Sequence, residues 1–126
     1  MDKQETNRDR ATDLGTVRIN NDAIMTIASI SALEVRGVHR MGGGIRRTLY
    51  DIFKKAGTKG VTIRMRDSEV KLTVSIIVEY GVDIPRIADE VQENVKRAVE
   101  KMTGLALSEV DVVVEGVSGK TLKEAI

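Results

Sequence analysis

Residues 78–104 constrain the fold more than any other part of the chain, because they encode a strand, a turn and a helix in succession. In residues 84–102 apolar side chains recur at steps of three and four, which predicts an amphipathic α-helix about 30 Å long. Asp83 and Pro85 are typical of a helix start, and Gly104 is typical of a helix end. Since a helix with one apolar stripe must cover another apolar surface, we expect this helix to lie on a sheet.

Shorter patterns before and after this helix predict the remaining elements. Alternation of apolar and polar residues indicates strands, and three- and four-residue spacing indicates helices. This order of elements predicts a single α+β domain, in which a mixed β-sheet carries helices mainly on one face. The predicted strands are residues 16–19, 37–41, 61–66, 70–80 and 110–114, with a bulge at Gly116; the predicted helices are residues 22–33, 45–55 and 84–103.

The two ends of the chain differ in composition from the centre. Residues 1–13 are polar and lack apolar periodicity, and residues 118–126 contain only three apolar side chains. We therefore expect a flexible N-terminal tail at residues 1–13, a domain at residues 14–117 and a C-terminal tail at residues 118–126. In the strand before the long helix, Tyr80 is expected on the buried face.

The composition argues against catalysis. Cysteine is absent and His39 is the only histidine. This composition excludes thiol chemistry and argues strongly against zinc or iron sites built on Cys and His. Asp89, Glu90 and Glu93 resemble a carboxylate cluster, but they lie opposite the apolar stripe of their helix, where a solvated face explains them. We expect a cytoplasmic protein with no catalytic residue, no metal site and no cofactor.

The middle third of the chain is strongly basic. Residues 36–71 hold ten basic and three acidic residues, a net charge of +7. Within this block the spacing predicts a short basic amphipathic helix at residues 45–55, whose apolar side would pack on the domain or contact a partner or lipid. The block also suits nucleic acid, although a total of three aromatic residues is few for base stacking. The predicted partner-binding residues are Arg46, Arg47, Tyr50, Phe53, Lys54 and Lys55.

The helix at residues 22–33 has more apolar surface than one sheet contact requires. One stripe faces the core, and a second patch contains Ala23, Ile30 and Leu33. Either the helix is wedged between the sheet and a loop, or the second patch mediates self-association through Ile30 and Leu33. The second interpretation predicts a homo-oligomer.

Four segments together resemble the alkaline-shock-protein family of bacterial cell envelope stress response proteins. They are GTVRINNDAIMTIA, EVRGVHRM, residues 78–104 and SEVDVVVEGV. The resemblance implies a small cytoplasmic, non-enzymatic protein; some members gather at the membrane through an integral membrane partner, and others look like regulators of envelope or fatty-acid metabolism. The segment IRRTLYDIFKKAGTK is more basic than is typical of the family, which bears on the choice of partner.

These observations predict an adaptor or scaffold in the envelope stress response. It would act by protein–protein association. A membrane-anchored protein is one candidate partner. Two alternatives stay open: a nucleic-acid-binding regulator that uses residues 36–71, and a regulator that docks on a fatty-acid or envelope biosynthetic enzyme.

Overall fold

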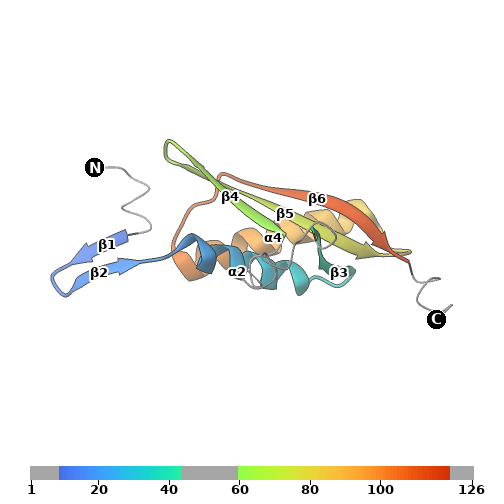
Figure 1. Ribbon diagram of the computed structural model, residues 1–126, viewed down its shortest axis with the longest axis horizontal. Helices are drawn as coiled ribbons and strands as arrows, with labels where there is room; N and C mark the ends of the chain where they lie inside the picture. The colour runs from blue at the N-terminus through green and yellow to red at the C-terminus, as the bar shows by residue number, and fades with distance from the viewer. Residues whose placement is uncertain (1–8, 44–59, 120–126) are drawn as a thin grey trace.

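The computed structural model describes residues 9–43 and 60–119, and of residues 9–12 it describes the backbone alone (Figure 1). Two helices and six strands follow one another in this part of the chain, which confirms the predicted α+β class. The elements are β1 (Asp9–Thr12), β2 (Gly15–Arg18), α2 (Asn21–Leu33), β3 (Val38–Met41), β4 (Val61–Arg66), β5 (Glu69–Glu79), α4 (Ile84–Thr103) and β6 (Glu109–Ser118).

Strand β5 organises the main sheet, because β3, β4 and β6 all pair with it. β3 and β4 lie antiparallel on successive parts of β5, and β6 runs parallel to it, so the sheet is mixed as predicted. At the junction of β3 and β4, the Ser75 carbonyl accepts the Gly42 N–H at 2.8 Å, and the Ser75 N–H donates to the Gly60 carbonyl at 2.7 Å. Ser75 therefore bonds both to the residue that follows β3 and to the residue that precedes β4. The chain leaves this edge of the sheet and returns to it at the same position of β5.

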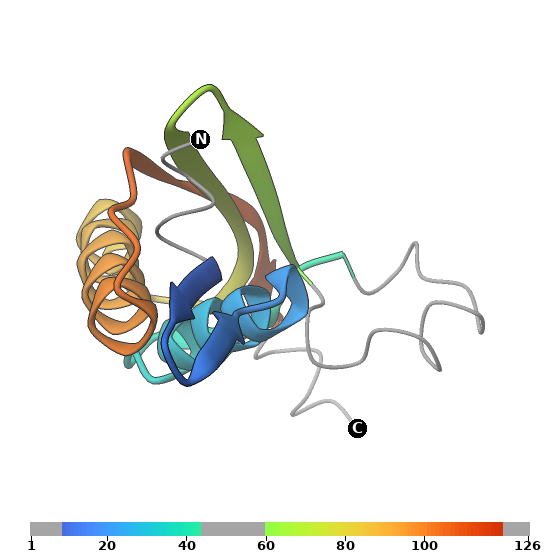
Figure 2. The same ribbon diagram turned by 90° about the vertical axis from the view of Figure 1, so that its left-hand side faces the viewer.

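The core lies between one face of the sheet and the two helices (Figure 2). Alternate residues of β5 are buried while their neighbours are half-buried on the open face, as the period of two predicts. The stripe of α4 is equally regular, and each fully buried aliphatic side chain contributes about 1.5–3 kcal/mol to stability. The buried residues of these two elements are Val70, Leu72, Val74, Ile76, Val78, Ile87, Val91, Val95 and Val99.

Local signals set both ends of α4, as the sequence predicts. Asp83 accepts a hydrogen bond on Oδ1 from the Arg86 N–H at 3.4 Å, and a proline occupies the first turn. Gly104 ends the helix with φ of 80°, a left-handed conformation that suits glycine.

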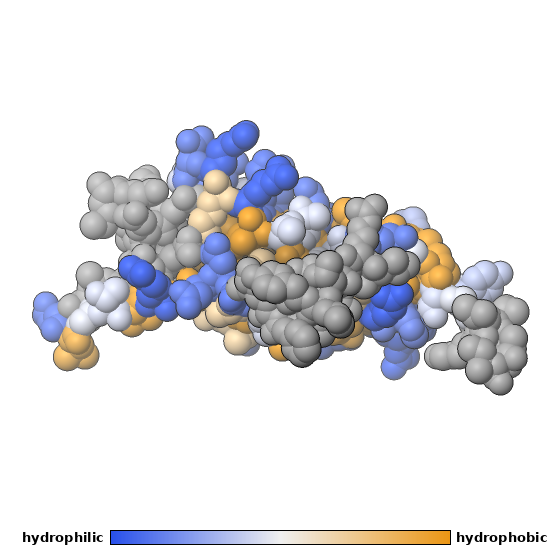
Figure 3. Space-filling model, in the orientation of Figure 1, coloured by the Kyte–Doolittle hydropathy of each residue, from blue (hydrophilic) through white to orange (hydrophobic). Residues whose placement is uncertain are grey.

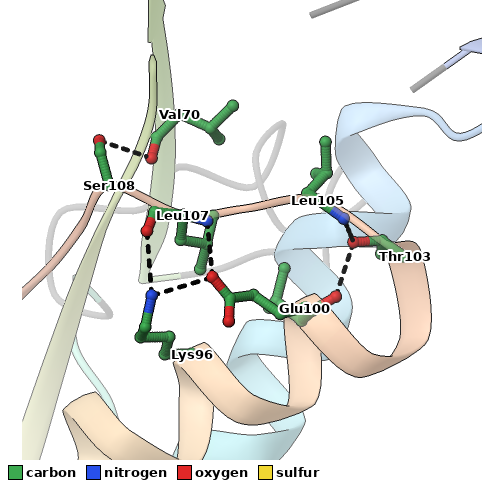
Figure 4. Close-up of polar contacts among 8 residues, drawn as sticks. Val70, Lys96, Glu100, Thr103, Leu105, Leu107 and Ser108 are labelled. Atoms are coloured by element: carbon green, nitrogen blue, oxygen red, sulfur yellow. Dashed lines mark hydrogen bonds and ion pairs between the residues drawn. The ribbon is translucent and has the colours of Figure 1, made fainter. Parts of the chain in front are cut away.

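The turn after α4 is held by polar contacts that direct the chain into β6 (Figure 4). The Lys96 ammonium group lies 2.9 Å from Glu100 Oε2 and donates to the Leu107 carbonyl at 3.0 Å. The Leu107 N–H in turn donates to Glu100 Oε2 at 2.8 Å. The hydrogen bond from Lys96, and then the one from the Leu107 N–H, lower the pKa of Glu100 below its ordinary value. One carboxylate thus joins the helix to the start of the last strand.

Two details differ from the sequence-based expectation. Asp9–Thr12, expected in the tail, form β1 and pair antiparallel with β2. Backbone hydrogen bonds to β2 hold β1, whose sequence has no alternation of apolar residues, so apolar periodicity gave no sign of this strand. Tyr80 was expected to be buried but is 72% exposed, because β5 ends at Glu79 and Tyr80 lies in the following turn.

The predicted irregularity near Gly116 is present. Between Ile76 and Ile77 the pairing of β5 with β6 shifts by one residue, which leaves Glu115 as the extra residue of a β-bulge. β6 continues beyond the bulge to Ser118, one residue past the predicted end of the domain.

Candidate interaction surface

Helix α2 exposes a line of uncharged residues on the side away from the core. Its inner side is fully buried, for example at Ile24 and Ala28. On the outer side Ile30 is 54% and Leu33 is 44% exposed. Two smaller residues continue the same line toward the start of the helix, an exposed alanine and a half-buried threonine. We call this surface the α2 seam; it consists of Ala23, Thr26, Ile30 and Leu33.

The composition of α2 explains why the seam is apolar. A surface helix normally places charged residues on its solvent side, as α4 does with Asp89 and Glu93. Helix α2 contains one charged residue, Asp22, in its first turn. The outer side of α2 therefore has few polar groups for water to solvate. Contiguous exposed apolar surface of this kind is typical of interaction sites.

The seam belongs to a firmly held helix. Asn94 of α4 donates from Nδ2 to the Ser31 carbonyl at 2.7 Å, which ties the two helices together near the end of α2. At the turn after α2, Gly37 adopts φ of 109° and lies against Ile87, where a Cβ atom would be 2.6 Å from Ile87 Cδ1. This close approach is open to glycine alone. The position of the seam is thus fixed by the core.

The structure brings together Ile30 and Leu33, the two residues predicted for self-association, on one exposed side of α2. Self-association itself stays a prediction. The predicted partner-binding residues of the basic segment lie outside the described residues, so no contact is assigned to them. These residues are Arg46, Arg47, Tyr50, Phe53, Lys54 and Lys55.

Two groups of basic residues in the described part of the chain lie apart from each other. Arg36 lies with Arg97 in a groove between the end of α2 and α4, which Glu90 and Glu93 also line. Arg64, by contrast, lies opposite Lys71 on the open face of the sheet. Because one group lies beside α4 and the other lies on the open face of the sheet, these two groups do not make one continuous track for a phosphate backbone.

Gly42, Gly43 and Gly44 follow one another after β3, and the amides of such a run can bind an anion. The Gly43 N–H donates to Glu115 Oε1 at 2.9 Å. A carboxylate at this amide repels an anion, which argues against a phosphate site there. Across residues 9–43 and 60–119, no three His, Cys, Asp or Glu side chains gather as a metal site.

One exposed feature was not anticipated from the sequence. The β1–β2 hairpin extends beyond the body of the domain (Figure 1), and apolar surface reaches its tip (Figure 3). Leu14 is fully exposed and Val17 is 55% exposed. The signal that could have identified it is a glycine turn, Gly15, between two apolar residues in an otherwise polar segment.

No helix in the described ranges is long and apolar enough to cross a bilayer.

Comparison with known proteins agrees with the earlier resemblance. The model of the alkaline shock protein 23 family, which has a cell envelope-related function, matches residues 9–119. The chain belongs to the alkaline shock protein 23 family. This confirms the predicted alkaline-shock-type membership and the association with the cell envelope and stress. The matched range also includes the hairpin at residues 9–18 and the whole of β6.

Several known bacterial proteins are similar to this chain over most of their length. The chain is 34% identical to uncharacterized protein YqhY of Bacillus subtilis over 116 residues, which cover 91% of this chain and 86% of YqhY. It is 32% identical to uncharacterized protein YloU of the same organism, over 84% of this chain and 91% of YloU. A stress response regulator gls24 homolog of Streptococcus pyogenes is 26% identical, over 88% of this chain and 63% of the homolog.

Among solved structures, the domain is similar to a MamM CTD. The sequence identity is 16% and the TM-score is 0.49, over 77% of this chain and 98% of that domain.

Proposed function

We propose that this protein is a non-enzymatic adaptor of the bacterial cell envelope stress response, which acts in the cytoplasm by protein–protein association. Its family has a cell envelope-related function, and its relatives include a stress response regulator homolog. The observation that carries the proposal is the α2 seam, an apolar surface on a helix whose position the core fixes.

Two carboxylates whose positions could suggest chemistry instead have structural roles. Glu100 is bonded to Lys96 and to the Leu107 amide, and Glu115 is bonded to the Gly43 amide. These contacts account for both carboxylates without a substrate. They support an adaptor more than an enzyme.

The seam favours a protein partner over a charged ligand. Lipid headgroups and nucleic acids are recognised by basic residues, and helix α2 contains none. An apolar helix face is the usual contact for another helix. A membrane-anchored protein that presents such a helix fits the proposal, with the predicted basic segment at residues 45–55 as an additional electrostatic contact. Docking on a biosynthetic enzyme would use the same surfaces.

The proposal is tested by complementation in the native organism. A strain that lacks the gene would receive the wild type, the seam variant Ile30→Asp or the control variant Val113→Asp. Val113 is suitable because it is 43% exposed on the open face of the sheet, away from α2. We expect the wild type and the control to restore growth under envelope stress and Ile30→Asp to fail at equal protein level. Full restoration by Ile30→Asp would contradict the proposal.

A further inference from the structure

We propose that the occupant of the α2 seam is the α2 seam of a second copy of this chain, packed antiparallel about a two-fold axis at residue 28. This inference rests on the proposed function, since it names the partner for the same surface. It adds a definite register, in which every contact of one copy is repeated in the other.

The spacing of the seam is the first argument. Its four residues follow one another at steps of three, four and three, which is the spacing of the a and d positions of a coiled coil. The core-facing side of α2 is broader, as is usual for a helix packed on a sheet. The outer side therefore has the narrow pattern of helix–helix pairing in addition to the pattern that the fold requires.

The sizes of the side chains are the second argument. The small residues Ala23 and Thr26 lie in the first half of α2, and the larger Ile30 and Leu33 lie in the second half. An antiparallel pair centred on residue 28 places Ala23 against Leu33 of the second copy and Thr26 against Ile30 of the second copy. Each large side chain then meets a small one, which lets the helices approach closely. A parallel pair would stack large on large and leave a gap at the small residues.

Electrostatics agrees with this arrangement. Asp22 is the single charged residue of α2, so no two charges of the same sign from the two helices face each other along the seam. Antiparallel helices also place each positive helix end beside the negative end of its neighbour, which is favourable.

The β1–β2 hairpin supplies further area for the same dimer. Two 13-residue helices bury less than the roughly 1,000 Å² that a stable interface needs. The hairpin extends past the start of α2 (Figure 1), which is the direction in which the end of the second copy's α2 lies in an antiparallel pair. Leu14 and Val17 are exposed on this arm. A two-stranded hairpin is marginal alone, so contact with a second copy would stabilise it.

Cysteine cross-linking tests the register, and the absence of native cysteine makes the experiment clean. Ala23→Cys and Leu33→Cys are made as separate proteins. In the proposed dimer identical positions lie about 15 Å apart along the helix axis, too far for a disulfide, whereas positions 23 and 33 of different copies face each other. We expect mild oxidation to yield a cross-linked dimer in the mixture of the two proteins alone. Cross-linking of either variant by itself, or none in the mixture, would overturn the register.

Sedimentation equilibrium tests the dimer and separates it from the proposed function. The purified wild type should be a concentration-dependent dimer, Ile30→Asp a folded monomer, and Val113→Asp a dimer like the wild type. A wild type that stays monomeric at all concentrations would refute the dimer. The proposed function would then survive if Ile30→Asp still failed in the complementation assay, because another protein would occupy the seam. A dimer lost in Ile30→Asp without any growth defect would support the inference and refute the function.

Discussion

The Glu115 carboxylate accepts the Gly43 N–H at 2.9 Å, although 72 positions separate the two residues in the sequence. The side chain starts at the bulge of β6 and reaches the end of β3 beyond β5. Gly42 permits this path, since a Cβ atom there would lie 2.5 Å from Glu115 Oε1 and 3.1 Å from Ser75 Cβ. The β-bulge at Glu115 and the missing side chain at Gly42 therefore both serve the hydrogen bond between Glu115 and Gly43.

Replacement of Gly42 by alanine should reduce the free energy of unfolding by about 1 kcal/mol, because the new methyl group displaces the Glu115 carboxylate. Glu115→Ala should have a similar effect. The double variant should lose about as much as one single variant, not their sum, since both changes break the same contact. Urea denaturation of the four proteins checks this, and strict additivity would show that the two residues are independent.

Gly37→Ala should be much more destabilising than Gly81→Ala. Both glycines have positive φ, 109° and 97°, so both alanines strain the backbone by about 1–2 kcal/mol. A Cβ atom at Gly37 also meets Ile87 Cδ1 at 2.6 Å, whereas Gly81 has nothing within 4 Å. This clash should add about 1–3 kcal/mol at Gly37. Thermal unfolding of the matched pair measures the difference, and equal losses would contradict the close helix approach.

Acid should weaken the turn after α4 through Glu100. Its pKa is lowered in the folded protein by hydrogen bonds from Lys96 and the Leu107 amide, so the unfolded state binds the proton more readily. The stabilisation is present above the ordinary glutamate pKa of about 4.3 and is lost as the pH falls through the lower folded pKa.

Glu100→Gln isolates this effect. The variant should be less stable than the wild type at neutral pH, and the gap should narrow as the pH falls below about 4.3. Denaturant titrations at several pH values measure the gap. A constant gap at every pH would mean that the charge of Glu100 does not stabilise the turn.

Exchange of large and small residues along the seam should rescue the dimer. Leu33→Ala leaves a gap opposite Ala23 of the second copy and should weaken dimerisation about 10-fold, as expected for the loss of a few methylene contacts. The double variant Ala23→Leu with Leu33→Ala restores one large and one small residue at each contact. Its dissociation constant should return toward that of the wild type. A double variant weaker than Leu33→Ala would contradict the antiparallel register.

Features that depend on residues close together in the sequence could be predicted. Both ends of α4 and its apolar stripe follow from the Asp83 cap, the Gly104 stop and side-chain spacing, all within one segment. The alternation of β5 predicted its buried face. It failed at Tyr80, because the alternation continues one residue beyond the strand, into a turn that contains Gly81.

Features that depend on distant parts of the chain could not be predicted. The sequence showed that α2 has two apolar sides, but burial by the sheet and α4 decided which one reaches solvent at Ile30 and Leu33. Strand β1 was missed because backbone pairing with β2 holds it. The Glu115 contact with Gly43 depends on the register of β6 along β5, which no local pattern encodes.

The central claim is that this protein works through the α2 seam. The most direct test replaces Ile30 with a photoreactive amino acid in living cells, illuminates them and measures covalent protein adducts by gel shift and mass spectrometry. Position 113, which is similarly exposed on the open face of the sheet, is the control. We predict strong, defined adducts from position 30 and background alone from position 113. Adducts from position 30 no stronger than those from position 113 would contradict the claim.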